Sequence, residues 1–220
     1  MLMRSYLYLA AAAASAVAMA FAVSPAEAST GHVLTISKAG GTAVKAKAVL
    51  KAGVASGKNV TFATSGGETL TCTSSSFSAT VKTNPAKPGK ATESLTKQTF
   101  SKCTVTGVSG ATVNSVKAGN LPYSVTVNDK GDTVTVSGTK SKPLTFTASV
   151  TVSGIGTVTC TDSATSITGK ASNTGNTITF TKQKFGYHGS NPFCTGGTFS
   201  ATFGPVTDTS VKGDPKVFVN

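Results

Sequence analysis

Apolar and polar residues alternate in short runs along most of this chain, and no stretch of useful length shows a helical period. In residues 144–152, apolar side chains alternate with Thr and Ser, which is typical of a strand with one buried and one wet face. Residues 123–127 alternate likewise, and the turn at 128–132 joins them to the run 133–137, which predicts a hairpin. Further candidate strands, separated by turn residues, cover residues 33–37, 44–51, 60–64, 69–73, 77–82, 105–116 in two pieces, 157–161, 166–170, 177–181, 198–203 and 217–219.

The abundance of Thr and Val strengthens this pattern, because β-branched side chains fit a pleated surface. The prediction is an all-β fold, a sandwich or a distorted barrel of many short antiparallel strands. Residues 29–220 are expected to form a single domain.

The chain also repeats itself. TLTCTSSSFSATVK (69–82) and TVTCTDSATSITGK (157–170) carry the same residue at eight of fourteen positions. TKQTF (96–100) and TKQKF (181–185) follow, and each leads to a cysteine. These matches predict two related halves, at about residues 60–116 and 148–205.

Four cysteines, Cys72, Cys103, Cys160 and Cys194, predict two disulfides. The repeat favours Cys72 with Cys103 and Cys160 with Cys194, which gives each half its own bridge. A pairing of Cys72 with Cys160 and Cys103 with Cys194, which would join the halves, stays open. No two cysteines are closer than 31 positions, whereas metal ligands cluster at short spacing, so neither a metal site nor a cofactor is expected.

The first 28 residues differ from the rest. A positive charge at Arg4 precedes a long apolar run, and Ala26-Glu27-Ala28 has the small-x-small pattern of a signal peptidase site. Residues 1–28 are therefore predicted to be a secretory signal peptide, with an uncleaved membrane anchor as the alternative. No later apolar run is long enough to span a bilayer, so we expect an extracellular or loosely surface-associated product.

After residue 28 the chain contains nineteen lysines, seven carboxylates and no arginine, a net charge of +12. This charge favours association with anionic envelope polymers or polysaccharide. Specific nucleic-acid recognition relies on arginine and is not expected. Lys45, Lys47 and Lys51 alternate along the predicted strand 44–51 and would form a basic face; protection of an edge strand explains the same pattern.

Residues 186–193, GYHGSNPF, stand between the second TKQ motif and Cys194, whereas only two residues separate the first motif from Cys103. The extra residues include Tyr187, His188 and Phe193, which we take as a candidate ligand loop. A cap over one end of the core is the other interpretation.

Groups for catalysis are scarce. The chain has two histidines, His32 and His188, and lacks the Gly-x-Ser-x-Gly pattern of a nucleophile elbow. Ser137-Gly-Thr-Lys140 fits Ser-x-x-Lys, but it falls at the end of a predicted strand rather than on a helix. We predict no catalytic residues.

The order TLTC, FSKCTVTG, NLPYSVTV and TVTC resembles a family of small secreted proteins of actinobacteria that are rich in Thr, Ser and Gly. Those proteins carry a Leu-Pro-Trp step where this chain has Leu121-Pro122-Tyr123. More distantly, the chain resembles the secreted activator-of-alkane-oxidation group. The resemblance implies a place at the cell exterior and brings no catalytic residues.

These observations together predict a secreted, cationic, non-enzymatic protein with a structural or adhesive role at the cell exterior. The alternative is an extracellular binding protein or inhibitor that presents the loop 186–193 to a partner the sequence does not identify. An enzyme of unknown type comes third.

Overall fold

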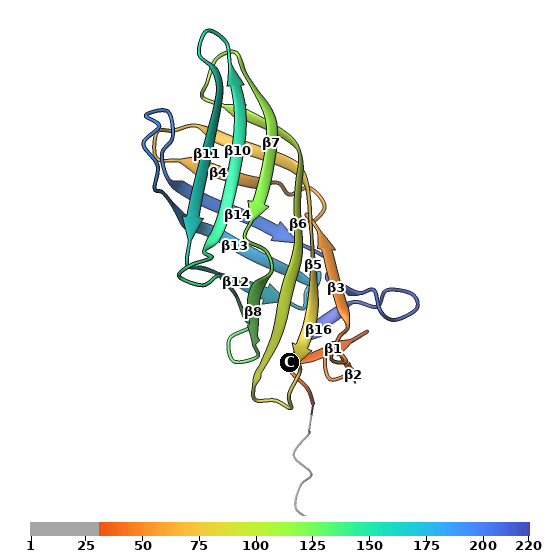
Figure 1. Cartoon of the computed structure of the whole chain (residues 1–220). Coiled ribbons are helices and arrows are strands. Elements are labelled where there is room, and N and C mark those ends of the chain that lie inside the picture. The colour runs from red at the N-terminus through yellow and green to blue at the C-terminus, as the bar shows by residue number, and fades with distance from the viewer. Residues whose placement is uncertain (1–30) are drawn as a thin grey trace, which may run out of the picture.

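The computed structural model describes residues 31–220, so the predicted signal peptide lies outside the described residues (Figure 1). The fold is all-β, as the alternation predicts. Its sixteen strands are β1 Leu34–Ile36, β2 Thr42–Ala43, β3 Val49–Gly53, β4 Val60–Thr64, β5 Thr69–Thr83, β6 Lys90–Thr106, β7 Ala111–Gly119, β8 Tyr123–Asn128, β9 Thr133–Ser137, β10 Leu144–Val152, β11 Gly156–Ala164, β12 Ser166–Ser172, β13 Thr177–Tyr187, β14 Gly197–Phe203, β15 Thr207–Asp208 and β16 Val217–Val219.

Eight of these strands close into a barrel. The order β6-β8-β9-β12-β13-β14-β4-β5 returns to its start because β5 also pairs with β6. A second path from β6 to β13 runs through β7, β10 and β11, since β11 pairs with β13 at Asp162 and Tyr187. The long strands β5 and β6 run beside both paths, with β7, β10 and β11 at the upper end in Figure 1 and β8 and β12 below them. Of the two expected architectures, the barrel is the correct one.

The wall of the barrel follows the alternation of the sequence. On β8, Tyr123, Val125 and Val127 are buried, while the residues between them turn outward. Thr and Ser on the outer face pair across neighbouring strands, as between Thr147 and Thr161, whose hydroxyl oxygens are 2.9 Å apart. Cross-strand pairs of this kind stabilise a sheet on its wet face.

The two ends of the described chain close the lower end of the barrel. Strand β1 pairs with β16 and β2 in a small three-stranded sheet, which lies beside the C-terminus in Figure 1. Leu34, Val217 and Val219 of this sheet are buried and line the barrel interior. The Asn220 side chain, next to β16, supports this sheet by donating to the hydroxyl oxygen of Thr35 on β1 at 2.9 Å.

The disulfides confirm the favoured pairing. Cys72 on β5 lies directly opposite Cys103 on β6, and the two are bonded. Cys160 on β11 is bonded to Cys194, which precedes β14. The alternative that joins Cys72 to Cys160 is therefore wrong.

The predicted strand 44–51 is wrong in its first half. Strand β3 begins at Val49, and the Ala48 amide donates to the Lys45 carbonyl oxygen at 3.2 Å, which makes a turn. Lys47 has a φ of 69°, a left-handed conformation that does not continue a strand. Lys45 and Lys47 thus do not share a strand face with Lys51.

Both TKQ motifs lie where the strand register shifts. Between β5 and β6 the shift falls at Thr96, and between β13 and β14 it falls between Phe180 and Gln183. An extra residue at such a bulge bends and twists the strand. The matched segments are arranged differently, because 69–82 lies within β5 whereas 157–170 is divided between β11 and β12. Duplication of the two halves stays a prediction.

Candidate functional site: the interior cavity of the barrel

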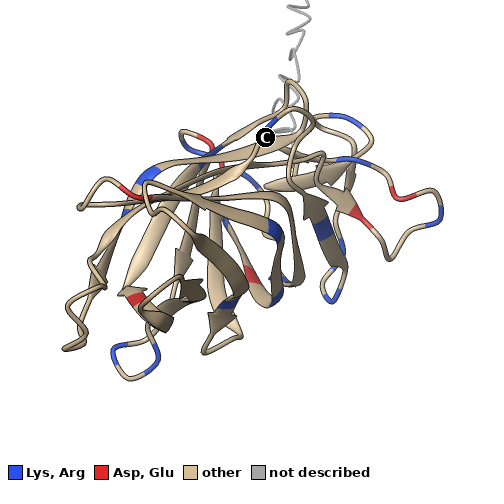
Figure 2. Ribbon diagram, turned by 90° about the horizontal axis from the view of Figure 1, so that it is seen from above, with Lys and Arg blue, Asp and Glu red and all other residues tan. Residues whose placement is uncertain are grey.

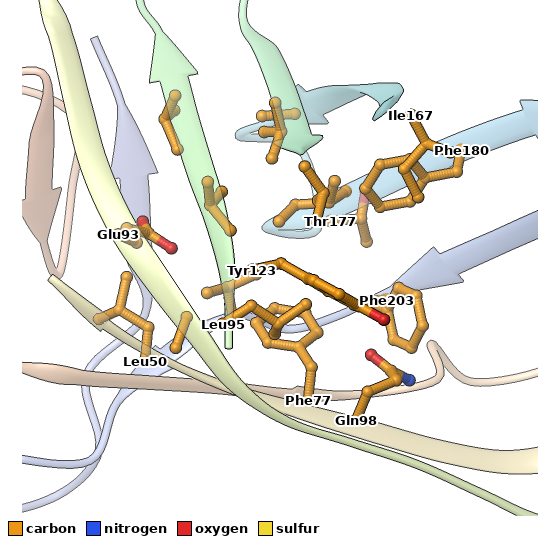
Figure 3. Close-up of a pocket in the computed structure, with 18 of the residues that line it drawn as sticks. Leu50, Phe77, Glu93, Leu95, Gln98, Tyr123, Ile167, Thr177, Phe180 and Phe203 are labelled. Carbon is orange, nitrogen blue, oxygen red and sulfur yellow. The ribbon is translucent and has the colours of Figure 1, made fainter. Parts of the chain in front are cut away.

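The barrel encloses a cavity of about 130 Å³ (Figure 3). An apolar cavity of about 150 Å³ is known to bind benzene, so this space suits a molecule with a body of about one ring. Its walls are mainly aliphatic and aromatic, and they include Leu50, Phe77, Leu95, Val136, Phe180 and Phe203.

An aromatic cluster forms one wall of the cavity. Phe62 of β4 stacks on Phe146 of β10, and its ring centroid lies 5.0 Å from that of Phe199 and 5.9 Å from that of Phe100. The four side chains come from four strands, β4, β6, β10 and β14, which the barrel brings together. They bind the wall strands to one another through large apolar contacts.

Glu93 places a carboxyl group in this apolar interior. Alternation on β6 turns Ala91, Glu93 and Leu95 inward, and Glu93 is only 8% exposed. Its cross-strand neighbours are Val81 on β5 and Val125 on β8. Burial disfavours the charged form and raises the pKa of Glu93 to about 7.

No hydrogen-bond donor reaches the Glu93 carboxylate within residues 31–220. A buried carboxylate is normally paired or hydrogen-bonded, because burying an unpaired one is costly. A strongly shifted carboxyl group that faces a cavity is therefore a candidate functional group. Figure 3 shows it with Gln98 and Tyr123 among the apolar side chains.

Several neighbouring polar groups are already hydrogen-bonded to the protein. The Gln98 amide nitrogen donates to Ser75 Oγ at 2.8 Å, and the Asn176 amide nitrogen donates to the Val217 carbonyl oxygen at 2.8 Å. The Tyr123 hydroxyl donates to the Gly119 carbonyl oxygen and accepts from the backbone amide of Thr145 at 3.0 Å. In the part of the chain that the structure describes, the amide oxygens of Gln98 and Asn176 accept no hydrogen bond. Glu93 is the one acidic side chain among the described residues that line the cavity.

The candidate loop 186–193 does not contribute to this cavity. Tyr187 belongs to strand β13, not to the loop, and its hydroxyl accepts from the Asn191 backbone amide at 2.8 Å. His188 is exposed. Phe193 is 61% exposed, so its side chain does not cover the core. Among the described residues that line the cavity, Phe185 is the one nearest to this loop in sequence.

A second carboxyl group lies near His188 on the upper part of the barrel. Asp162 is opposite Tyr187 in the sheet, and its Oδ1 atom is buried without a hydrogen-bond partner. Burial raises the pKa of Asp162 to about 6, and the nearby His188 acts in the opposite direction. In residues 31–220 no serine is hydrogen-bonded to either side chain, so they do not form the nucleophile-and-base arrangement that a serine hydrolase needs.

The candidate basic residues Lys45, Lys47 and Lys51 are all exposed. Lys51 lies on β3 opposite Ser78, and Lys97 of β6 lies on the other side of the same serine. Lysines are spread widely over the molecule in Figure 2 rather than gathered at one place. Across the described residues, no three His, Cys, Asp or Glu side chains come together in a way that suits a metal ion.

Glu93, Gln98 and Asn176 were not among the site residues predicted from the sequence. Glu93 could have been found because Ala91 and Leu95 lie two residues before and after it. In a strand, these three side chains lie on the same face, which is otherwise apolar. The fold and the cavity define a closed β-barrel with an apolar interior site that holds one buried carboxyl group.

No protein-family model matches the chain, and neither a curated protein nor a solved structure does. The resemblance to secreted actinobacterial proteins therefore stays a prediction. Among residues 31–220, no helix has the length and hydropathy needed to cross a membrane.

Proposed function

We propose that this chain is an extracellular binding protein that encloses a small, mainly apolar molecule inside its barrel. The observation that carries the proposal is the 130 Å³ cavity with its apolar walls and a few inward polar groups. Eight-stranded barrels are just wide enough to hold one small ligand, and binding sites of this kind combine an apolar lining with a few placed polar groups. The two disulfides fit an oxidising compartment. Export through the segment 1–28 stays a prediction.

Filling the cavity is expected to weaken binding. Val136 on β9 is buried and lines the cavity, so Val136→Phe should reduce the affinity for ethylbenzene by about tenfold or more, because the added ring occupies the ligand's space. Titration calorimetry on the purified protein measures this. The matched control is Thr135→Phe, which adds the same ring at the neighbouring outward position and should bind as the wild type does. The proposal is wrong if the wild-type protein binds no such one-ring compound, neither ethylbenzene nor its amine analogue benzylamine, or if Val136→Phe binds the compound equally well.

A second candidate function is the structural or adhesive role at the cell exterior, which the net charge of +12 and the exposed lysines favour. We expect the protein to sediment with isolated cell envelopes at about 20 mM salt and to be released at about 0.5 M, because salt screens exposed charges. Replacing Lys45, Lys47 and Lys51 by Gln should weaken this association about as much as replacing Lys130, Lys140 and Lys142, because the exposed lysines are not gathered at one place. A much larger effect of one set would show a localised binding face, and association that persists in high salt would contradict the electrostatic basis.

A further inference from the structure

The position of Glu93 is unfavourable for the protein alone. Its neighbours Val81 and Val125 are apolar, and the inward positions on either side of it hold Ala91 and Leu95. An apolar side chain would suit this position better, because a buried carboxylate without a partner loses its hydration and gains nothing in return. A molecule that enters the cavity with a complementary group would supply the missing partner.

The charge of Glu93 specifies that group. Glu93 is the one acidic side chain among the described residues that line the cavity, and burial is the cause of its raised pKa. An ammonium group has three donors, no acceptor and the opposite charge, so it matches the ionised carboxylate. A carboxylate ligand would meet a charge of its own sign, and a hydrocarbon would leave Glu93 unpaired.

Gln98 lies farther along the same strand as Glu93. Both side chains come from β6 and line the cavity, and the bulge at Thr96 restores Gln98 to the inward face after Leu95. Figure 3 shows Glu93 and Gln98 on opposite sides of the cavity, with Tyr123 and Phe77 between them. Since the aromatic rings Phe77, Phe180 and Phe203 also line the space, an apolar body has partners of its own.

We infer that the cavity selects a small primary amine with an apolar body of about one ring, and that Glu93 is the residue that binds its ammonium group. The inference rests on the proposed function, that the cavity holds a small molecule. It adds the chemical class of the ligand and the residue that determines specificity.

The test compares benzylamine with ethylbenzene, which has nearly the same shape without the charge, by titration calorimetry at pH 8. At this pH most of the Glu93 carboxyl groups are ionised. We expect benzylamine to bind wild-type protein about 10 to 100 times more tightly than ethylbenzene, which is the range for a hydrogen bond between charged groups. Glu93→Gln should remove most of that preference while it changes the affinity for ethylbenzene less than about threefold.

The matched control is Glu68→Gln, which removes the same charge from the turn between β4 and β5, outside the cavity. It should leave the preference for benzylamine unchanged, so a general effect of net charge is distinguished from a direct contact. If ethylbenzene binds and benzylamine binds no better, or if Glu93→Gln keeps the preference, the inference is overturned while the proposed function stands. If phenylacetate binds more tightly than benzylamine, the inference is also overturned. If none of the three compounds binds, both proposals are overturned.

Discussion

Replacing Phe62 by Ala should lower the free energy of unfolding by about 3 to 5 kcal/mol, the range for removal of a buried phenylalanine ring. Phe62 is 8% exposed and contacts Phe100, Phe146 and Phe199, which come from three other strands. Loss of its ring leaves a void where these strands meet, and a barrel wall collapses into such a void only in part. The cost should therefore lie above that of an ordinary core substitution.

Urea unfolding followed by far-ultraviolet circular dichroism measures this effect. The control is Thr61→Ala, at the neighbouring position of β4 that faces outward, which should change the free energy of unfolding by about 0.5 kcal/mol or less. A loss below about 1 kcal/mol for Phe62→Ala would mean that the aromatic cluster does not hold the wall strands together.

The fold class and the disulfides were predictable from the sequence for a physical reason. In a barrel, each strand has one buried and one solvent-exposed face. Apolar and polar residues therefore alternate along strands such as β8 and β10, and this alternation is visible in the sequence. The related TKQ motifs and cysteine spacing then favoured Cys72 with Cys103, which the structure confirms. The sequence did not decide between a barrel and a sandwich. Closure of the barrel depends on the pairing of β5 with β6, and alternation within each strand does not show which strands pair.

Strand β6, the longest in the protein, was not predicted over most of its length. Glu93 and Gln98 occupy inward positions there, and the bulge at Thr96 shifts the alternation by one residue, so no clean apolar row is visible. The inward polar residues and the bulge, which prevented the prediction of this strand, are thus part of the candidate site. Residues 186–193 were the predicted site instead, because their aromatic side chains stand out from a Thr and Ser background. In the structure Phe193 is exposed and Tyr187 ends a strand.

The buried Glu93 carboxyl group should lower the free energy of unfolding by about 3 kcal/mol as the pH rises from 4.5 to above 7, and Glu93→Gln should remove this contribution. The pKa of Glu93 is about 7 in the folded protein and has a reference value of 4.5. Below pH 4.5 the carboxyl group is protonated in both states, so no penalty exists. Between pH 4.5 and 7 unfolding releases a proton, and above pH 7 the folded state carries the full cost of the buried charge.

Unfolding in urea at a series of pH values from 4.5 to 8 measures the profile. At pH 8 the Glu93→Gln variant should be more stable than the wild type, and at pH 4.5 the two should be nearly equal. Asp162 also has a raised pKa, about 6, so Asp162→Asn should change a separate and lower part of the profile, between about pH 4 and 6. Identical profiles for the wild type and Glu93→Gln would show that the carboxyl group is solvated in the folded protein.

The same profile connects stability to ligand binding. A ligand that binds only the folded state stabilises it in proportion to the logarithm of its concentration relative to its dissociation constant. If an ammonium group pairs with Glu93, benzylamine should raise the stability of the wild type more at pH 8 than at pH 4.5, because only the ionised carboxylate attracts it. Ethylbenzene should show no such difference. The buried charge that weakens the protein above pH 7 is therefore also the charge that a cationic ligand would neutralise.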